Sequence, residues 1–265
     1  MTAGGIARSA RVMTRSPVAP FLLFAGLGCA GTALTASAQT RAPAPAEIIR
    51  TADGSRGNLE GIVWRLDAES RDGGSTTSMS FEVKARGFDV RAETTAPAKY
   101  RGNKVLMADH NEWFHRPGLS KPVPISRRQK LLGQAVYGDI ASTNYAQDYE
   151  ATLLSDGPVD GEPCYVFDLK SKAKWTTYDM IRYWISKERL VGIKAEYFTV
   201  SGKKFKSSRM EYENEVTVDG IRRPFISRLT IYDELVSGAV TELAFGPPAL
   251  GALPDYIFNV NLLAR

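Results

Sequence analysis

The stretch MSFEVKAR, Met79 to Arg86, alternates strictly between apolar and polar side chains. Successive side chains of an extended strand point to opposite faces, so the apolar residues of this stretch share one face. Residues 61–66, GIVWRL, show the same period of two. Asp72-Gly73-Gly74 lies between the two stretches and is typical of a tight turn. We therefore predict two antiparallel strands, each with one buried face.

Alternation and turns of this kind continue along most of the chain. Further expected strands share the period of two, and they are residues 149–153, Cys164 to Leu169, Ile181 to Ser186, Val191 to Val200, Phe205 to Glu213, Ile226 to Tyr232 and Val240 to Phe245. Turn sequences such as Ser201-Gly202 and Asp219-Gly220 separate several of them. Turns at such short spacing predict a long antiparallel meander of about ten strands.

Two segments depart from this pattern. Glu47 to Asp53 carries a short helical pattern that ends at Gly54. In Arg127 to Thr143, the apolar residues around Gly133 are spaced as in a helix. We predict one short amphipathic helix in each segment. A long antiparallel sheet must bury one face, so we expect the helices to cover the concave side of a mainly β fold.

The beginning of the chain indicates export. It carries three arginines and no acid before an apolar run from Val18 to Leu34, and Ala36-Ser37-Ala38 supplies small residues for cleavage. The pattern is typical of a secretory signal peptide, which we expect to be cut after Ala38. The run is shorter than about 20 residues, so a retained membrane span is the weaker alternative. We expect a signal peptide over residues 1–38, a Pro/Ala-rich tether over 39–46 and one domain over 47–265.

The charge of the mature chain argues against nucleic acid as a partner. Residues 1–38 contain three of the 34 Lys and Arg and none of the 29 Asp and Glu, which leaves 31 against 29, a net charge of +2. Nucleic acid attracts a concentrated basic face, which so balanced a chain lacks. The exception is residues 116–130, with five basic residues and no acid. Either this segment faces an anion or it is an ordinary solvated loop. Arg127 and Arg128 are the candidates for contact with a head group or an acidic partner.

Catalytic and metal-binding patterns are sparse. The only histidines, His110 and His115, lie five positions apart in DHNEWFH, and an odd separation on a strand directs them to opposite faces. We therefore predict no metal site. Cys164 is the only cysteine after the signal peptide, so no internal disulfide is expected, and no serine stands in a Gly-x-Ser-x-Gly motif. We predict neither an enzyme nor a bound cofactor.

Short segments in a fixed order carry a resemblance that covers nearly all of the mature chain. They are Ile48-Ile49-Arg50, Glu112-Trp113-Phe114, Tyr137-Gly138-Asp139-Ile140, Asp148-Tyr149, Gly161-Glu162-Pro163-Cys164-Tyr165, Arg182-Tyr183-Trp184-Ile185, Lys194 to Phe198 and Ile257 to Leu263. In this order they resemble the outer-membrane lipoprotein-sorting proteins, relatives of the periplasmic carrier LolA. No single segment is diagnostic, and the serial order is what is specific.

The resemblance implies a LolA/LolB-like, half-open antiparallel barrel, covered by short helices, whose apolar hollow receives the acyl chains of a lipid or lipoprotein in the periplasm. The host is needed because each methylene costs about 0.8 kcal/mol in water. From the alternation we expect the hollow to be lined by Phe81, Val83, Trp113, Tyr183 and Phe198. A register slip of one residue would exchange each of them for its neighbour.

Several alternatives stay open at this point. A barrel of this size either encloses an apolar ligand or packs its interior with its own side chains. The segment from Tyr137 to Leu154 either ends a mobile covering insertion, with Asp139 or Ser142 as a cap, or is a plain junction with the next strand. The chain carries lipid toward an outer-membrane acceptor, or it is an accessory protein that docks on an inner-membrane transporter. A hydrolase would need a convergent polar triad, which the sequence does not offer.

Overall fold

The structure, a computed structural model, describes residues 43–57, 59–141 and 143–265. The expected signal peptide, its cleavage position after Ala38 and the first part of the expected tether lie outside these residues. Within the described part, no helix is both long enough and apolar enough to span a membrane.

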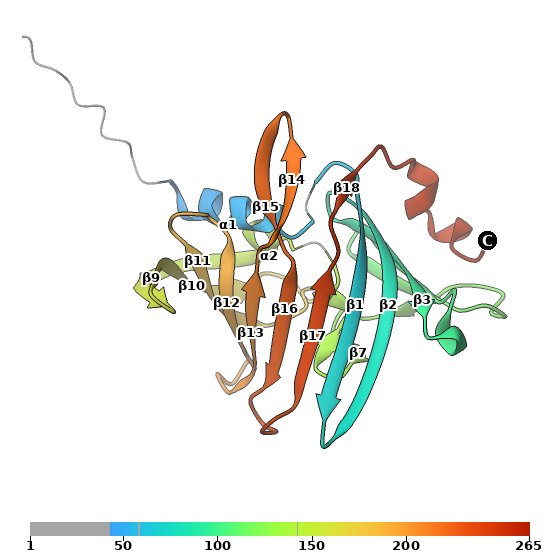
Figure 1. Ribbon diagram of the computed structural model, residues 1–265, viewed down its shortest axis with the longest axis horizontal. Helices are drawn as coiled ribbons and strands as arrows, with labels where there is room; N and C mark the ends of the chain where they lie inside the picture. Colours follow the sequence, from blue (N-terminus) through green and yellow to red (C-terminus); the bar gives the residue numbers. More distant parts are fainter. Residues whose placement is uncertain (1–42, 58, 142) are drawn as a thin grey trace, which may run out of the picture. The chain divides into compact units, whose positions relative to one another are not determined.

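A single 14-stranded antiparallel sheet dominates the described residues (Figure 1). In spatial order its strands are β6 (Val123–Ile125), β5 (Asn111–His115), β4 (Lys104–Ala108), β3 (Asp89–Ala96), β2 (Ser75–Arg86), β1 (Ile62–Asp72), β17 (Val240–Phe245), β16 (Arg228–Asp233), β13 (Lys204–Glu211), β12 (Gly192–Phe198), β11 (Met180–Ser186), β10 (Glu162–Ser171) and β9 (Tyr149–Val159), with β18 (Ala249–Leu250) beside the start of β1. The end strands β6 and β9 do not pair with each other, so the barrel is open. The expected fold class is confirmed, with more strands than the sequence indicated.

The first and last parts of the chain meet in the middle of this sheet. β1 pairs with β2 on one side and with β17 on the other, so Leu66 lies opposite both Phe81 and Phe245. Directly opposed residues of antiparallel strands share a face. These three side chains therefore define one face of the sheet, which we call the inner face, and all three are buried.

The remaining elements are short. They are α1 (Pro45–Gly54), η1 (Ala98–Tyr100), the hairpin β7 (Lys130–Leu132) and β8 (Ala135–Val136), η2 (Tyr137–Asp139), α2 (Tyr145–Asp148), the hairpin β14 (Asn214–Val218) and β15 (Ile221–Phe225), η3 (Asp255–Phe258) and η4 (Val260–Leu262). The expected first helix is present as α1 and begins at Pro45 rather than Glu47. Proline suits the first turn because its missing N–H would have no partner there.

The helix expected over Arg127 to Thr143 is wrong. The chain instead forms the β7–β8 hairpin and the single turn η2. Gly133 has a φ of 51°, a left-handed conformation typical of tight turns, and Leu132 pairs with Ala135 across the turn. Apolar pairs on either side of a two-residue turn have the same spacing as one face of a helix, and this explains the error.

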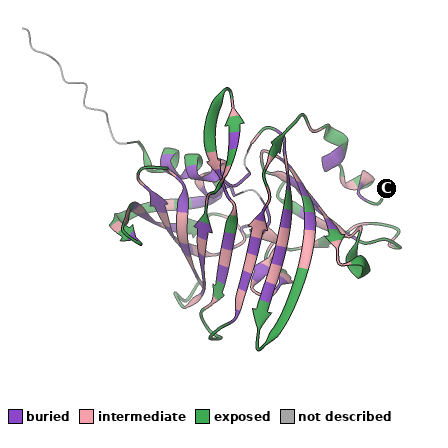
Figure 2. Ribbon diagram, in the orientation of Figure 1, coloured by how far each residue is buried: buried purple, intermediate pink, exposed green. Residues whose placement is uncertain are grey.

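The main core lies on the inner face of the sheet. α1 buries Ile48, Ile49 and Ala52 in the same apolar cluster as Leu66 and Phe81. Figure 2 shows buried residues alternating with more exposed ones along β1, β16 and β17. Burying a large apolar side chain contributes about 1.5–3 kcal/mol, so this face supplies most of the stability of the sheet.

A smaller cluster lies on the outer face. Leu106 and Ala108 of β4 pack there against Ile257 and Phe258 of η3, with Leu263 completing the cluster. The C-terminal turns therefore cover part of the sheet that would otherwise present apolar side chains to water.

Candidate functional site

The inner face is covered by α1 and by the segment between β6 and β9. We call this segment the cover, and it consists of residues 126–141 and 143–148. Leu132, Ala135 and Ile140 of the cover are buried in the main core. At the tip of the β7–β8 hairpin, the backbone N–H of Gln134 donates to Thr241 Oγ1 of β17 at 2.8 Å. The cover is thus packed directly on the sheet.

Three of the five expected hollow-lining residues face this covered interior. Phe81 and Val83 of β2 and Tyr183 of β11 are at most 2% exposed and belong to the main core cluster. Whether they contact an acyl chain stays a prediction. Their inward orientation follows from the pairing of β2 with β1 and of β11 with β12.

The expected inward orientation of Trp113 and Phe198 is wrong. Trp113 lies opposite Leu106 and packs into the outer-face cluster, while its neighbour Phe114 contacts the main core. Phe198 lies on the outer face beneath Arg182, whose guanidinium carbon is 5.8 Å from the ring centroid, and Tyr197 points inward instead. Both errors are register slips of one residue.

The interior is filled by the protein's own aromatic side chains. Tyr145 of α2 makes edge-to-face contacts with Tyr149 and Tyr183, with ring centroids 5.3 and 5.4 Å apart. Tyr178 and Tyr197 lie 4.1 Å apart. A cavity of about 20 Å³ lies between the cover and the β10–β11 loop, enough for a water molecule but not for an acyl chain. Of the two alternatives, the described structure therefore has the filled interior.

A buried ion pair joins the cover to the sheet. Lys206 Nζ of β13 lies 2.8 Å from Asp139 Oδ2, and the two side chains are only 3% and 4% exposed. The Tyr178 hydroxyl donates to Asp139 Oδ1 at 2.7 Å and also contacts Lys206 Nζ, and the Val136 N–H donates to Asp139 Oδ2 at 2.9 Å. Burial lowers the pKa of Lys206, and the Asp139 carboxylate opposes this effect. Asp139 thus caps the end of the hairpin, while Ser142, the other candidate cap, lies outside the described residues.

Lys206 is a functional candidate that the sequence did not single out. The signal was present, because Lys206 alternates in phase with Ser208 and Met210 and therefore faces inward. A lysine at such a position needs a buried acid as its partner. The identity of that partner, 67 positions away, depends on how the cover folds back.

A second contact joins α1 to α2 beneath the surface. Asp53 at the end of α1 accepts a hydrogen bond from the Ala146 N–H at 2.9 Å. Burial raises the pKa of Asp53 to about 6, against the lowering effect of that hydrogen bond. Nearby, Arg56 is 5% exposed, and its Nη1 atom has no hydrogen-bond partner among the described residues.

Arg127 and Arg128 attach the beginning of the cover to its surroundings. Arg127 forms an ion pair with Glu112 of β5, and these side chains are 11% and 7% exposed. Burial raises the pKa of Glu112, while Arg127 opposes the shift. Arg128 donates from Nε to the Thr176 carbonyl at 3.0 Å and from Nη2 to Asp179 Oδ1 at 2.8 Å. Both guanidinium groups therefore have internal partners, and their contact with a head group or another protein stays a prediction.

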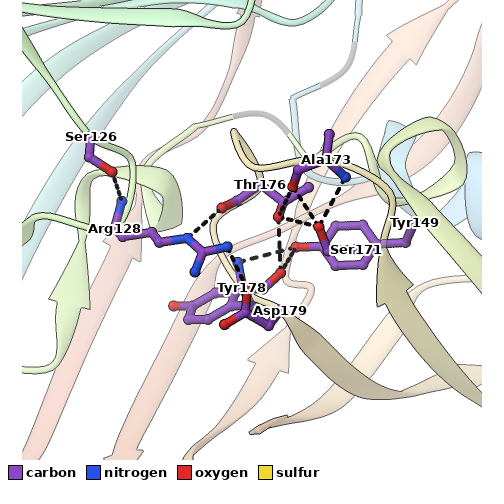
Figure 3. A network of polar contacts seen from close by, with 8 residues as sticks. All are labelled: Ser126, Arg128, Tyr149, Ser171, Ala173, Thr176, Tyr178 and Asp179. Carbon is purple, nitrogen blue, oxygen red and sulfur yellow. Dashed lines mark hydrogen bonds and ion pairs between the residues drawn. The ribbon is translucent and has the colours of Figure 1, made fainter. Parts of the chain in front are cut away.

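The loop that receives Arg128 is itself held by hydrogen bonds (Figure 3). Tyr149 Oη donates to the Tyr178 carbonyl at 2.9 Å and accepts from the Tyr178 N–H at 3.2 Å. The Ser171 and Thr176 hydroxyls are 2.7 Å apart. The β10–β11 loop thus forms a firm support for one side of the cover.

The two histidines contact an aromatic ring and a backbone carbonyl, and the cysteine is buried. His110 packs against Trp175 at 4.8 Å between ring centroids, and His115 Nε2 lies 3.0 Å from the Leu119 carbonyl oxygen. Cys164 is buried, and burial raises the pKa of its thiol. Across the described ranges, no group of three His, Cys, Asp or Glu side chains is arranged to hold a metal ion.

Wider pockets also open on the surface. One of about 570 Å³ lies between α1, the turn after β11 and the β14–β15 hairpin. Another of about 690 Å³ lies beside the β10–β11 loop and is lined by Lys170, Lys172 and Lys174. Both have basic side chains at their rims, and neither was expected from the sequence.

Comparison with known proteins agrees with this architecture. A family model that carries the description "Uncharacterized protein" matches residues 90–265. None of the curated proteins matches the chain. The structure is similar to that of a LolA superfamily protein from Nitrosomonas europaea, with a TM-score of 0.74 and 31% identity over 83% of this chain and 99% of the other.

Two more distant structures share the fold. A putative outer membrane lipoprotein-sorting protein domain from Vibrio parahaemolyticus has a TM-score of 0.71 and 16% identity over 83% of this chain and 98% of its own. A DUF1329 family protein from Desulfovibrio piger has a TM-score of 0.68 and 19% identity over 82% of this chain and 95% of its own. At these identities the likeness concerns the fold alone.

Proposed function

Because this chain belongs to the LolA superfamily, we propose that it is a periplasmic carrier that binds the acyl chains of a lipid or lipoprotein against the inner face of its sheet. The activity is binding and release, and no bond is made or broken. The expected signal peptide supports export to the periplasm. An outer-membrane acceptor and an inner-membrane transporter are the partners that such a carrier requires.

The observation that carries this proposal is the independence of the cover from the main sheet. β7 and β8 form a two-stranded sheet of their own, so the hairpin can lift without breaking any ladder of the 14-stranded sheet. The hairpin and the turn after it are attached to the sheet by polar contacts at Gln134 and Asp139. Arg127, Arg128, Ala146 and Gln147 hold the two ends of the cover. Beneath it lie Phe81, Leu66 and Tyr183, all buried. Displacing the cover would therefore expose an apolar face suited to acyl chains.

The energetics make such a displacement reasonable. At about 0.8 kcal/mol per methylene, burying a chain of about fifteen methylenes contributes roughly 12 kcal/mol. That exceeds the few kcal/mol that separate many closed and open states of proteins. A ligand shifts such an equilibrium by its differential affinity for the two states, and an acyl chain has no room in the closed state. Lipid would bind only the open form.

The test is direct extraction of bound lipid. The mature protein is purified from its native envelope without detergent, extracted with organic solvent, and its lipids are measured by mass spectrometry. A periplasmic protein of unrelated fold, purified in parallel, is the control. We expect a reproducible lipid species in the extract that the control lacks. A lipid content equal to that of the control across independent preparations would contradict the proposal.

A second candidate function is favoured by the filled interior. An accessory protein that docks on an inner-membrane transporter needs no hollow, which agrees with an interior filled by aromatic side chains. One envelope preparation distinguishes the two functions. Envelope cross-linking that captures a transporter, together with extracts free of lipid, would favour docking over carriage.

A further inference from the structure

Four arginines from three distant parts of the chain meet at the pocket of about 570 Å³. Arg50 lies on the exposed side of α1, Arg189 lies in the turn after β11, and Arg222 and Arg223 lie on β15. In Figure 1 the β14–β15 hairpin stands beside α1 at the upper edge of the view, and the pocket has residues of both in its lining. The three segments lie more than 30 positions apart in the sequence, and only the fold brings them together.

In the part of the chain that the structure describes, two of these arginines form no ion pair. Arg189 forms two hydrogen bonds with Glu162, at 3.0 and 2.8 Å, and Arg222 lies 3.3 Å from Glu215. Within the described residues, Arg50 and Arg223 form no ion pair, and both are exposed. Glu188 is the one acidic residue that lines this pocket in the described structure. The rim therefore carries an excess of positive charge with unused hydrogen-bond donors.

The floor of the same pocket is apolar. It is formed by Leu59, Leu190, Val191 and Pro224, and the first two pack against the main core. A volume of about 570 Å³ falls within the usual range for small-molecule sites. Guanidinium groups bind phosphate through paired, charge-assisted hydrogen bonds. A cationic rim over an apolar floor suits a ligand that carries a phosphate at one end and hydrocarbon at the other.

We propose that this pocket binds the phosphate head group of an anionic lipid, with Arg50 and Arg223 as the principal contacts and Leu59 and Leu190 beneath the first carbons of its chains. This inference rests on the proposed function and deepens it, because it names the class of lipid. The lysine pocket beside the β10–β11 loop has a comparable charge but not the same geometry, since Lys172 Nζ already donates to the Gln147 carbonyl at 3.0 Å. Lysine also lacks the paired donors of arginine.

The test uses monomeric dihexanoyl-phosphatidylglycerol, titrated into the mature protein by calorimetry. We expect Arg50→Gln/Arg223→Gln to weaken binding at least tenfold. The matched control, Lys170→Gln/Lys174→Gln, removes the same charge from the other basic pocket and is expected to change affinity less than twofold. All four side chains are exposed, and thermal unfolding confirms that each variant folds. Equal weakening by both pairs would reveal unspecific charge attraction and overturn the proposal.

Two further ligands identify what the pocket recognises. Dihexanoyl-phosphatidylcholine has no net charge, and we expect it to bind at least tenfold more weakly than the glycerol lipid. Inorganic phosphate tests the head group without hydrocarbon. If phosphate alone binds as tightly as the lipid, the pocket is a free-phosphate site and the lipid assignment is wrong.

The outcomes separate this inference from the proposed function. An extract without lipid, combined with arginine-dependent binding of the short lipid, would refute carriage while supporting the head-group pocket. Conversely, the wild type and the Arg50→Gln/Arg223→Gln variant could both carry lipid with the same head-group composition. That result would support carriage and refute the head-group role of the pocket.

Discussion

At the scale of single residues, the buried charges beneath the cover are the most informative feature. Lys206 and Asp139 are almost fully buried, and each depends on the other because an isolated buried charge is strongly unfavourable. Asp53 shows the opposite balance. It has one hydrogen bond and no cationic partner at bonding distance in the described structure, and burial raises its pKa to about 6. The two acids therefore differ in what stabilises them in the folded protein.

Replacing Lys206 tests the buried pair. We expect Lys206→Met to lower the free energy of unfolding by about 3–5 kcal/mol, because Asp139 would remain buried without its cation. The double variant Lys206→Met/Asp139→Asn should lose less than the single variant. Urea unfolding monitored by fluorescence measures both. Lys203→Met on the exposed turn is the control, with an expected change within about 0.5 kcal/mol. Equal losses for the single and double variants would show that the pair is not coupled.

The pH dependence of stability tests Asp53. Its pKa is higher in the folded protein than in the unfolded chain, so its contribution is present below about pH 4 and is lost as the pH rises through about 6. The stability of the wild type relative to Asp53→Asn should therefore fall by about 2 kcal/mol between pH 4.5 and 7.5. Urea unfolding of both proteins at the two pH values measures this difference, in which the other titrating groups cancel. A difference independent of pH would contradict the raised pKa.

At the scale of elements, the β7–β8 hairpin determines how the inner face is covered. Gly133 at its tip lies so close to the sheet that an added Cβ would overlap the Ser70 and Thr241 hydroxyl oxygens. Its φ of 51° is also strained for any residue with a side chain. Any other residue here would force the hairpin or the Ser70 and Thr241 side chains to shift.

Substitution of this glycine should loosen the cover and leave the sheet intact. We expect Gly133→Ala to increase amide hydrogen exchange across residues 130–139, while the strands of the main sheet keep their protection. The matched control is Gly202→Ala, whose φ is also positive at 82° but which has open space around it. That variant should affect only its own turn. Unchanged exchange in residues 130–139 would mean that the hairpin does not rest on Ser70 and Thr241.

At the scale of the whole molecule, the sheet is open but its interior is closed by the cover. An open barrel with unpaired end strands β6 and β9 can change its curvature more readily than a closed one, because no ladder joins its two edges. The cover and α1 complete the enclosure without joining the main sheet. The proposed carriage of lipid would therefore require the cover to move away from the inner face.

Export is also a property of the whole chain, and it leaves a measurable product. We expect the protein isolated from the envelope to begin at Gln39, because the signal peptidase prefers small residues before the cut. N-terminal sequencing and intact mass determine this position. A protein that retains residues 1–38 would contradict the expected signal peptide.

The sequence by itself determined the features that depend only on residues close together in the chain. The alternation in Met79 to Arg86 is sufficient to define a strand and its buried face, because the period of two is a property of extended backbone. The pattern of Glu47 to Asp53 is likewise sufficient for α1. Phe81, Val83 and Tyr183 were placed inward on the same grounds. Family resemblance added the open barrel.

Tertiary structure alone decided what depends on contacts between distant parts. Trp113 and Phe198 face outward because strand pairing sets their register, and a slip of one residue is invisible in an aromatic-rich stretch. The partner of Lys206 and the convergence of Arg50 with Arg223 depend on chain segments that return from far away. The sequence also could not decide whether the interior is open or filled, because only the packed structure shows which side chains occupy that space.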